Sequence, residues 1–156
     1  MGLHLSEQQF ADMQKKNPHL KIKGGDKPSG ESKKKPRVNS NKVEADGHLF
    51  DSKSEYRIYY EFKLDPTVKI LELQPEFILQ EEFELRGKKY QAIKFTPDFR
   101  IIRDGIEWIV EVKSQGTMLA NSKSYSMRRK MFLKSNPDLR YREIIFNRGK
   151  RVEKVY

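Results

Sequence analysis

The sequence predicts an α/β fold built on a mixed β-sheet, and two stretches carry that prediction. Residues 96–114 form a β-hairpin pattern, in which two β-branched, apolar-rich runs flank Asp104-Gly105, a dipeptide typical of two-residue type I′ turns. A helical pattern follows this hairpin, and after it comes another strand pattern, over residues 139–146. A strand–helix–strand order makes its two strands parallel. Antiparallel and parallel neighbours together give a mixed sheet.

Residues 1–42 are expected to form a basic, partly flexible N-terminal extension. Ser6 is the predicted N-cap of a short helix that runs to Lys16, with Phe10 and Met13 along one face. Beyond this helix, glycines, prolines and a run of lysines leave almost nothing to bury, which favours a flexible arm.

A second hairpin is predicted over residues 43–50, again with Asp-Gly at its turn. A helix follows, because Ser52 is a good N-cap and Glu55 stands three residues later, as in a capping box. Asp65-Pro66 ends this helix. On local physics alone, Glu55 is a capping residue.

The second half of the chain carries four further predicted elements. A short strand is expected around residues 77–79, and a third hairpin around Arg86-Gly87-Lys88. A helix runs from residue 121 or 122 to about 135, followed by the strand over 139–146. In this helix the predicted inward residues are Tyr125, Met131 and Phe132, and the predicted outward residues are Arg128, Arg129 and Lys130. The main domain is expected at 43–146, and residues 147–156 are expected to form a basic, mobile tail.

The hairpin register predicts a cluster of charged side chains. A two-residue turn at 104–105 pairs Asp98 with Glu111, and opposed residues project from the same side of a sheet. Lys113 lies two residues after Glu111 and therefore shares that side. Two opposed carboxylates resist ionising unless a cation lies between them, and carboxylates suit Mg²⁺ or Mn²⁺.

An ordinary solvated sheet face is the alternative to a catalytic site. Cross-strand acids and lysines are common there, and the acid-x-Lys pattern occurs at three other places in this chain: Glu31/Lys33, Asp51/Lys53 and Glu61/Lys63. The copy at Glu111 differs in context, because it ends an apolar strand and has an aspartate in register across a predictable turn.

Pro97-Asp98 followed by Glu111-Val112-Lys113 resembles the signature of the PD-(D/E)XK nuclease superfamily. Upstream, the run from Asp46 to Glu55 and then Leu73-Gln74-Pro75 and Phe77 resemble small phage-borne nucleases, which are similar to the endonuclease I-like Holliday-junction resolvases. The resemblance covers roughly residues 43–146. It implies a core with the order αβββαβ and an N-terminal extension.

The resemblance also implies a set of roles. Asp98 and Glu111 are expected to hold Mg²⁺, for which Mn²⁺ would substitute, with the help of the Val112 carbonyl. Lys113 is expected to assist the attacking water. Glu55 matches an acid on the helix before the core hairpin and is expected to bind or orient a second ion or water. Gln74 matches a polar position of the relatives.

The net charge of +10 is unevenly distributed along the chain. Residues 1–42 carry +6, residues 43–112 carry −5 and residues 113–156 carry +9. An acidic middle between basic segments fits an enzyme that cuts a polyanion. The alternative is a basic protein whose tail binds other molecules non-specifically, as in many small basic proteins. The candidate DNA contacts are Lys33, Lys34, Lys35, Arg37, Lys123, Arg128, Arg129 and Lys130.

The expected activity is therefore Mg²⁺-dependent DNA cleavage, with branched DNA as substrate and a homodimer as the working unit. The N-terminal helix and the 43–50 hairpin offer apolar residues for an interface. Two alternatives stay open: a nuclease for linear DNA or DNA ends, and a DNA-binding module without catalysis. Without cysteines or a long apolar run, the chain is expected in the cytoplasm, in a bacterial host if a phage encodes it, and away from membranes.

Overall fold

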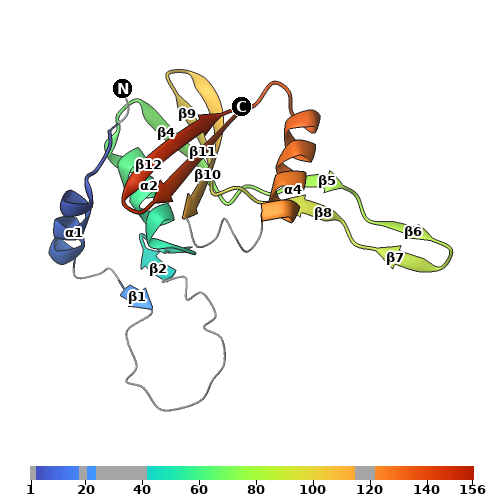
Figure 1. Cartoon of the computed structure of the whole chain (residues 1–156), viewed down its shortest axis with the longest axis horizontal. Coiled ribbons are helices and arrows are strands. Elements are labelled where there is room, and N and C mark those ends of the chain that lie inside the picture. Colours follow the sequence, from blue (N-terminus) through green and yellow to red (C-terminus); the bar gives the residue numbers. More distant parts are fainter. Residues whose placement is uncertain (1–2, 18–20, 24–41, 115–121) are drawn as a thin grey trace, which may run out of the picture. The chain divides into compact units, whose positions relative to one another are not determined.

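The computed structural model describes residues 3–17, 21–23, 42–114 and 122–156, and it shows a mixed α+β protein (Figure 1). The chain divides into two compact units, residues 1–65 and residues 66–156. The expected main domain, residues 43–146, takes in parts of both units. None of the helices in the described ranges is long and apolar enough to span a bilayer.

The described residues of the first unit form two helices and a small antiparallel sheet. The helices are α1 (Glu7–Lys16) and α2 (Lys53–Leu64); the strands, in the order β1-β2-β3, are β1 (Lys21–Lys23), β2 (Lys42–Ala45) and β3 (His48–Phe50). The predicted hairpin is confirmed, because β2 pairs with β3 and both turn residues, Asp46 and Gly47, have positive φ angles of 51° and 77°. Positive φ at both central positions defines a type I′ turn.

The predicted N-caps of α1 and α2 are confirmed, while Asn121, a predicted cap of the later helix together with Ser122, lies outside the described residues. Ser6 and Gln9 form a reciprocal capping box at the start of α1. At the start of α2, the Glu55 N–H donates to Ser52 Oγ at 3.1 Å. Such side-chain caps satisfy backbone donors that have no partner within the helix, which stabilises a helix by about 1 kcal/mol each.

Part of the apolar surface that was expected to seek a partner subunit packs within its own unit, although no residue of α1 is fully buried and Leu49 of β3 is 48% exposed. The ring of Phe10 in α1 lies 5.9 Å from the ring of Tyr56 in α2. Val43 and Phe50, from the hairpin, are buried, and Phe50 contacts the rings of Tyr56 and Tyr59. The N-terminal helix and the hairpin therefore pack against α2, which is the common outcome for short appendages.

A five-stranded mixed sheet forms the body of the second unit. Its strands, in the order β12-β11-β10-β9-β4, are β4 (Val68–Leu73), β9 (Phe99–Arg103), β10 (Ile106–Ser114), β11 (Arg140–Asn147) and β12 (Lys150–Val155). Strands β10 and β11 are parallel and are joined through α4 (Ser122–Ser135), while the other neighbours are antiparallel. The predicted mixed sheet and its parallel crossover are confirmed.

One face of this sheet packs against α4. The core there consists of Phe95, Ile109, Phe132 and Tyr141, all buried, and the ring of Phe132 on α4 lies 5.7 Å from that of Tyr141 on β11. Fully burying one such side chain contributes about 1.5–3 kcal/mol. This packing fixes α4 over the strands that carry the candidate site.

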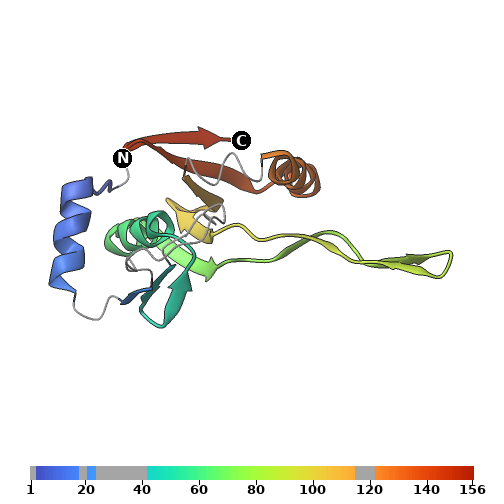
Figure 2. The same cartoon turned by 60° about the horizontal axis from the view of Figure 1, so that its bottom comes forward.

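Between β4 and β9 the chain forms a long two-stranded arm. It consists of β5 (Phe77–Gln80) paired with β8 (Ile93–Phe95) and, further out, β6 (Phe83–Leu85) paired with β7 (Lys88–Tyr90). Arg86 and Gly87 at its tip have positive φ angles of 52° and 73°, which confirms the third predicted hairpin. Figure 2 shows the arm running away from α4 of the same unit.

Residues 147–156, predicted to be a mobile tail, instead form the edge strand β12. They turn at Arg148-Gly149, where both φ angles are positive, and pair antiparallel with β11. The prediction failed because most of β12 is polar and exposed, so it lacks the apolar alternation of a half-buried strand. Strand β4 was also absent from the prediction.

Candidate active site

The register of the central hairpin is as predicted. Residues 104 and 105 have φ angles of 52° and 75°, and the pairs run from Ile106–Arg103 outward to Val110–Phe99. The ladder ends at this pair, and Asp98 immediately precedes β9, so continuing the register by one step brings Asp98 to the level of Glu111. The two-residue turn thus fixes which residues meet at the open end of the hairpin.

Asp98 is held from two sides. Its Oδ2 accepts a 2.6 Å hydrogen bond from the Val112 N–H, and its backbone carbonyl accepts a 2.8 Å bond from the Gln74 N–H. Because the N–H and C=O of one strand residue point to the same edge, the Val112 carbonyl also lies on this side of β10, past the end of the ladder with β9. The Val112 carbonyl therefore points to the same edge of β10 as the N–H that donates to Asp98.

Gln74, whose function the sequence left open, anchors Asp98 through its backbone. Its φ angle of 51° lies in the left-handed region, which costs most side chains about 1–2 kcal/mol. Gln74→Val is expected to lower the free energy of unfolding by about that amount, because a β-branched residue fits this region poorly. Gln74→Asn should be near neutral, since Asn tolerates it. Chemical denaturation checks both, and equal stability of the two variants would contradict this account.

Glu111 and Lys113 meet on the face of the sheet that α4 covers. The Glu111 side chain is 7% exposed, and its Oε1 forms an ion pair with Lys113 Nζ. The same ammonium lies 4.1 Å from the centroid of the Tyr125 ring on α4, a cation–π contact that holds it in place. Oε2 of Glu111 is buried and has no hydrogen-bond partner in the described part of the chain.

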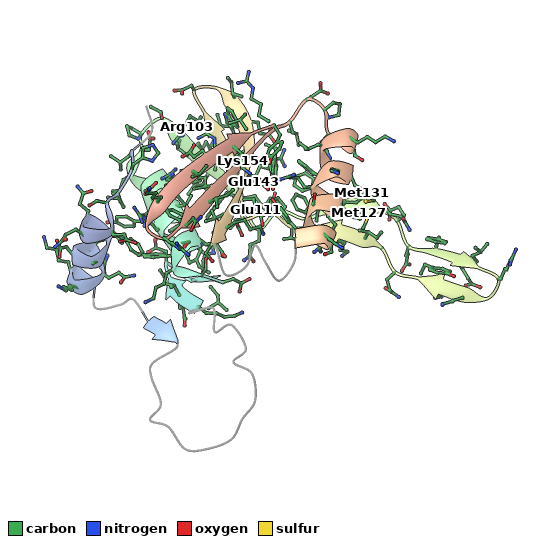
Figure 3. All side chains as sticks on the ribbon, viewed as in Figure 1. Arg103, Glu111, Met127, Met131, Glu143 and Lys154 are labelled. Atoms are coloured by element: carbon green, nitrogen blue, oxygen red, sulfur yellow. The ribbon has the colours of Figure 1, made fainter. Side chains whose placement is uncertain are left out.

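Glu143 lies beside Glu111 on the neighbouring parallel strand (Figure 3). Burial raises the pKa of the Glu111 carboxyl; Glu143 raises it further, and Lys113 and Arg128 only partly offset the rise. Burial also acts to raise the pKa of Glu143, but hydrogen bonds from three side chains outweigh it and the pKa is lowered. The two carboxyls therefore differ: Glu143 is held as an anion, whereas Glu111 still lacks stabilisation of its charge.

The groups that satisfy Glu143 form a buried network. Arg129 Nη1 donates to Oε1 at 2.7 Å, the Tyr156 hydroxyl donates to Oε2 at 2.9 Å, and the Tyr125 hydroxyl also donates to Oε1. Sequence reasoning missed Glu143. The available signal was an acid between Tyr141 and Ile145, at the core-facing positions of an alternating strand.

The network corrects the expectation for Arg129. It was predicted to point outward and to contact DNA, but its side chain is only 18% exposed and is paired with Glu143. Its guanidinium also lies 4.4 Å from the centroid of the Tyr156 ring. Arg129 on α4 thus points toward the buried Glu143 of the sheet. Its position along the helix alone did not predict this contact.

The other predicted DNA contacts have different placements. Lys33, Lys34, Lys35 and Arg37 lie outside the described residues. On α4, Lys123 and Lys130 are exposed. Arg128 is half-buried and donates to Ser124 Oγ at 3.2 Å, and its positive charge acts to lower the pKa of the Glu111 carboxyl.

Glu55 belongs to the first unit, and its carboxylate completes the N-terminus of α2. Oε2 accepts from the Asp51 N–H at 2.9 Å, and Oε1 accepts from the Ser52 hydroxyl at 3.0 Å. The capping role is therefore established, and a share of Glu55 in metal binding stays a prediction.

The chemistry of the donor set fits a divalent cation. Glu111 offers a buried oxygen without a hydrogen bond, and Asp98 and the Val112 carbonyl lie at the same end of the hairpin. Within the described ranges no group of three or more His, Cys, Asp or Glu residues is arranged to hold a metal ion. Mg²⁺ does not need such a cage, because it commonly uses one or two carboxylates and completes its shell with water and substrate phosphate.

Comparisons with known proteins identify a family. A solved structure described as "Crystal structure of SSO0001" resembles this chain with a TM-score of 0.42 and 18% sequence identity; the match covers 65% of this chain and 47% of that one. No curated protein matches significantly. Residues 35–152 match the family described as "Protein of unknown function (DUF1064)". Since this match spans most of the sequence, the chain belongs to the DUF1064 family.

Proposed function

We propose that this protein is a Mg²⁺-dependent DNA endonuclease of the PD-(D/E)XK superfamily, of the type that resolves branched DNA. The order of its elements supports the proposal: α2, β4, β9, β10, α4 and β11 follow the order αβββαβ, with the arm inserted after the first core strand. The Pro97-Asp98 and Glu111-Val112-Lys113 segments fall at the open end of the central hairpin, as in that signature.

The observation that carries the proposal is the state of Glu111. A buried carboxylate normally has every oxygen bonded, as Glu143 next to it does. Among the residues that the structure describes, Glu111 Oε2 has no hydrogen-bond partner, and Lys113 contacts only the other oxygen. A solvated sheet face, the main alternative, would not bury this group. Unfavourable burial of this kind is characteristic of ligand-binding and catalytic carboxylates.

The proposed reaction is hydrolysis of a phosphodiester. The attacking water gives up a proton to solvent and forms a new P–O bond, the bond to one ester oxygen breaks, and the leaving oxygen takes up a proton from solvent. Asp98, Glu111 and the Val112 carbonyl would hold the Mg²⁺ ion, which would lower the pKa of a bound water and neutralise phosphate charge. Lys113, oriented by Glu111 and the Tyr125 ring, would donate a hydrogen bond to the attacking water or to the phosphate oxygens.

Contacts to the DNA backbone are assigned to α4. The charge of Arg128 acts on Glu111, and Lys123 and Lys130 are exposed on the same helix. Each lysine that neutralises one phosphate contributes about 0.9 to the slope of log affinity against log salt concentration. Arg129 is left out of this set because it is committed to Glu143.

The branched substrate and the dimer belong to the same proposal. A four-way junction is resolved by paired nicks on strands related by a two-fold axis, which a two-fold dimer with one site per subunit would match. At the interface expected at α1 and the β2–β3 hairpin, Phe10 and Phe50 pack against α2, while Leu49 stays 48% exposed.

Cleavage assays with matched substrates test the proposal. The full chain is expected to cut a four-way junction in Mg²⁺ or Mn²⁺, with no cleavage in EDTA and slower cleavage of a linear duplex of the same arm sequences. Equal rates on both substrates would favour a nuclease for linear DNA. Tight DNA binding without cleavage in either metal would favour a binding module and contradict the proposal.

A further inference from the structure

The outer part of the arm is a surface without cover in its own unit. Every residue from Gln80 to Gln91 is exposed, including all six in β6 and β7. In both Figure 1 and Figure 2, no described element of the second unit lies beside β6 or β7. A two-stranded ribbon by itself is marginally stable in water, and both of its edges offer unpaired backbone groups.

One face of this outer arm is apolar. The register pairs Phe83 with Tyr90 and Leu85 with Lys88, and the period of two places all four side chains on the same face. The rings of Phe83 and Tyr90 are stacked 4.7 Å apart, and Lys88 Nζ lies 5.4 Å from the centroid of the Tyr90 ring. Phe83 and Leu85 are nevertheless 44% and 55% exposed, so the cluster lacks a covering layer.

The charges of the outer arm are separated along its length. Its acids, Glu81, Glu82 and Glu84, all precede the turn, and its bases, Arg86, Lys88 and Lys89, lie at or just after it. The step from Glu82 to Arg86 spans roughly 13 Å of strand. Glu84 lies opposite Lys89 in the register, level with the apolar cluster, so these two charges offset each other. The root end, with Glu81 and Glu82, is therefore acidic, and the tip, with Arg86 and Lys88, is basic.

We propose that a second copy of this chain covers the arm, with the two arms packed antiparallel about a two-fold axis. In that arrangement the basic tip of each arm lies against the acidic segment of the other, since antiparallel overlap exchanges the two ends. The apolar clusters, which lie midway, then meet at the axis. Such an interface is isologous, because each subunit contributes the same patch. Opposite charges at both ends would set the register.

The basic tip could instead bind DNA, but the charge pattern of the outer arm disfavours this alternative. The outer arm carries three acids and three bases, so it has no net positive charge to attract phosphates. Three large apolar side chains would also remain uncovered against a sugar-phosphate backbone. A second copy satisfies both the charges and the apolar face.

Sedimentation velocity of the full chain over a concentration series, without DNA or metal, tests the proposal independently of the nuclease function. Wild-type protein is expected to show a monomer–dimer equilibrium. The tip variant Lys88→Glu/Lys89→Glu and the root variant Glu81→Lys/Glu82→Lys should each weaken self-association about tenfold or more. An equimolar mixture of the two should restore the dimer, because each tip then meets a root of opposite charge.

Two further variants make the test specific. Phe83→Ser/Leu85→Ser should also weaken the dimer, without changing any charge. Lys150→Glu/Lys154→Glu makes the same charge change as the tip variant, but on exposed positions of β12, and should leave association unchanged. A wild-type monomer at every concentration, or a mixture that fails to dimerise, would overturn the proposal. So would a tip variant that associates normally but loses DNA affinity, which would make the arm a DNA contact.

Discussion

Glu111→Gln is expected to abolish DNA cleavage and, at neutral pH, to raise the free energy of unfolding. Loss of a metal-binding carboxylate should lower the cleavage rate by at least roughly 10²–10³-fold. The stability gain has a separate origin. The buried Glu111 carboxyl has a raised pKa, so folding at neutral pH places a negative charge where it is poorly stabilised. A neutral amide of the same shape removes that cost.

The pH dependence of this difference has a defined sign. Between the ordinary carboxyl pKa of 4.5 and the raised pKa in the fold, the folded protein binds more protons at Glu111 than the unfolded chain. The contribution of Glu111 to the free energy of unfolding therefore falls as the pH rises through that interval. The free energy of unfolding of Glu111→Gln should therefore rise relative to that of the wild type from about pH 4.5 upward. Below that pH the two values should converge.

Thermal unfolding over a pH series, with and without Mg²⁺, measures these effects. Mg²⁺ should raise the melting temperature of the wild-type protein and have little effect on Glu111→Gln, because ligand binding stabilises only a fold that holds the ligand. Glu107→Gln is the matched control: it lies on the same strand but pairs with Arg100 at a half-exposed position. Wild-type cleavage by Glu111→Gln would contradict the assigned site.

Arg129→Met is expected to destabilise the fold by about 3 kcal/mol, the cost of leaving a buried carboxylate without its ionic partner. Glu143 would keep its two tyrosine hydroxyl donors but lose the guanidinium 2.7 Å away. Lys130→Met, the exposed neighbour on α4, should change stability by less than roughly 0.5 kcal/mol. Chemical denaturation measures all of these values.

A double variant separates the ion pair from simple loss of packing. Arg129→Met/Glu143→Gln removes both charges and should be more stable than Arg129→Met alone. The salt dependence of DNA binding should be unchanged in Arg129→Met and reduced by about 0.9 in slope for Lys130→Met. A large loss of slope in Arg129→Met, with no loss of stability, would restore Arg129 as a DNA contact.

Local chemistry in the sequence determined the turns, the caps and the central register. The Asp-Gly pairs at 46–47 and 104–105 adopt the positive φ angles that type I′ turns require, so the hairpins followed from two residues each. Ser6 and Ser52 cap their helices through contacts three residues away. The register of β9 on β10, out to the pair Phe99–Val110, followed because a two-residue turn leaves one register. Each of these depends on interactions between residues near in sequence.

Only the tertiary structure decided the interactions between distant residues. Strand β12 is an edge strand whose polar sequence carries no burial pattern, so its pairing with β11 became visible only with the sheet assembled. Arg129 turned inward because Glu143, on the next strand, was buried beneath α4. The difference between Glu111 and Glu143 has the same origin. Two glutamates share one face of adjacent strands, and the donors that reach one of them come from α4 and the C-terminal residue, so no local pattern could assign their charges.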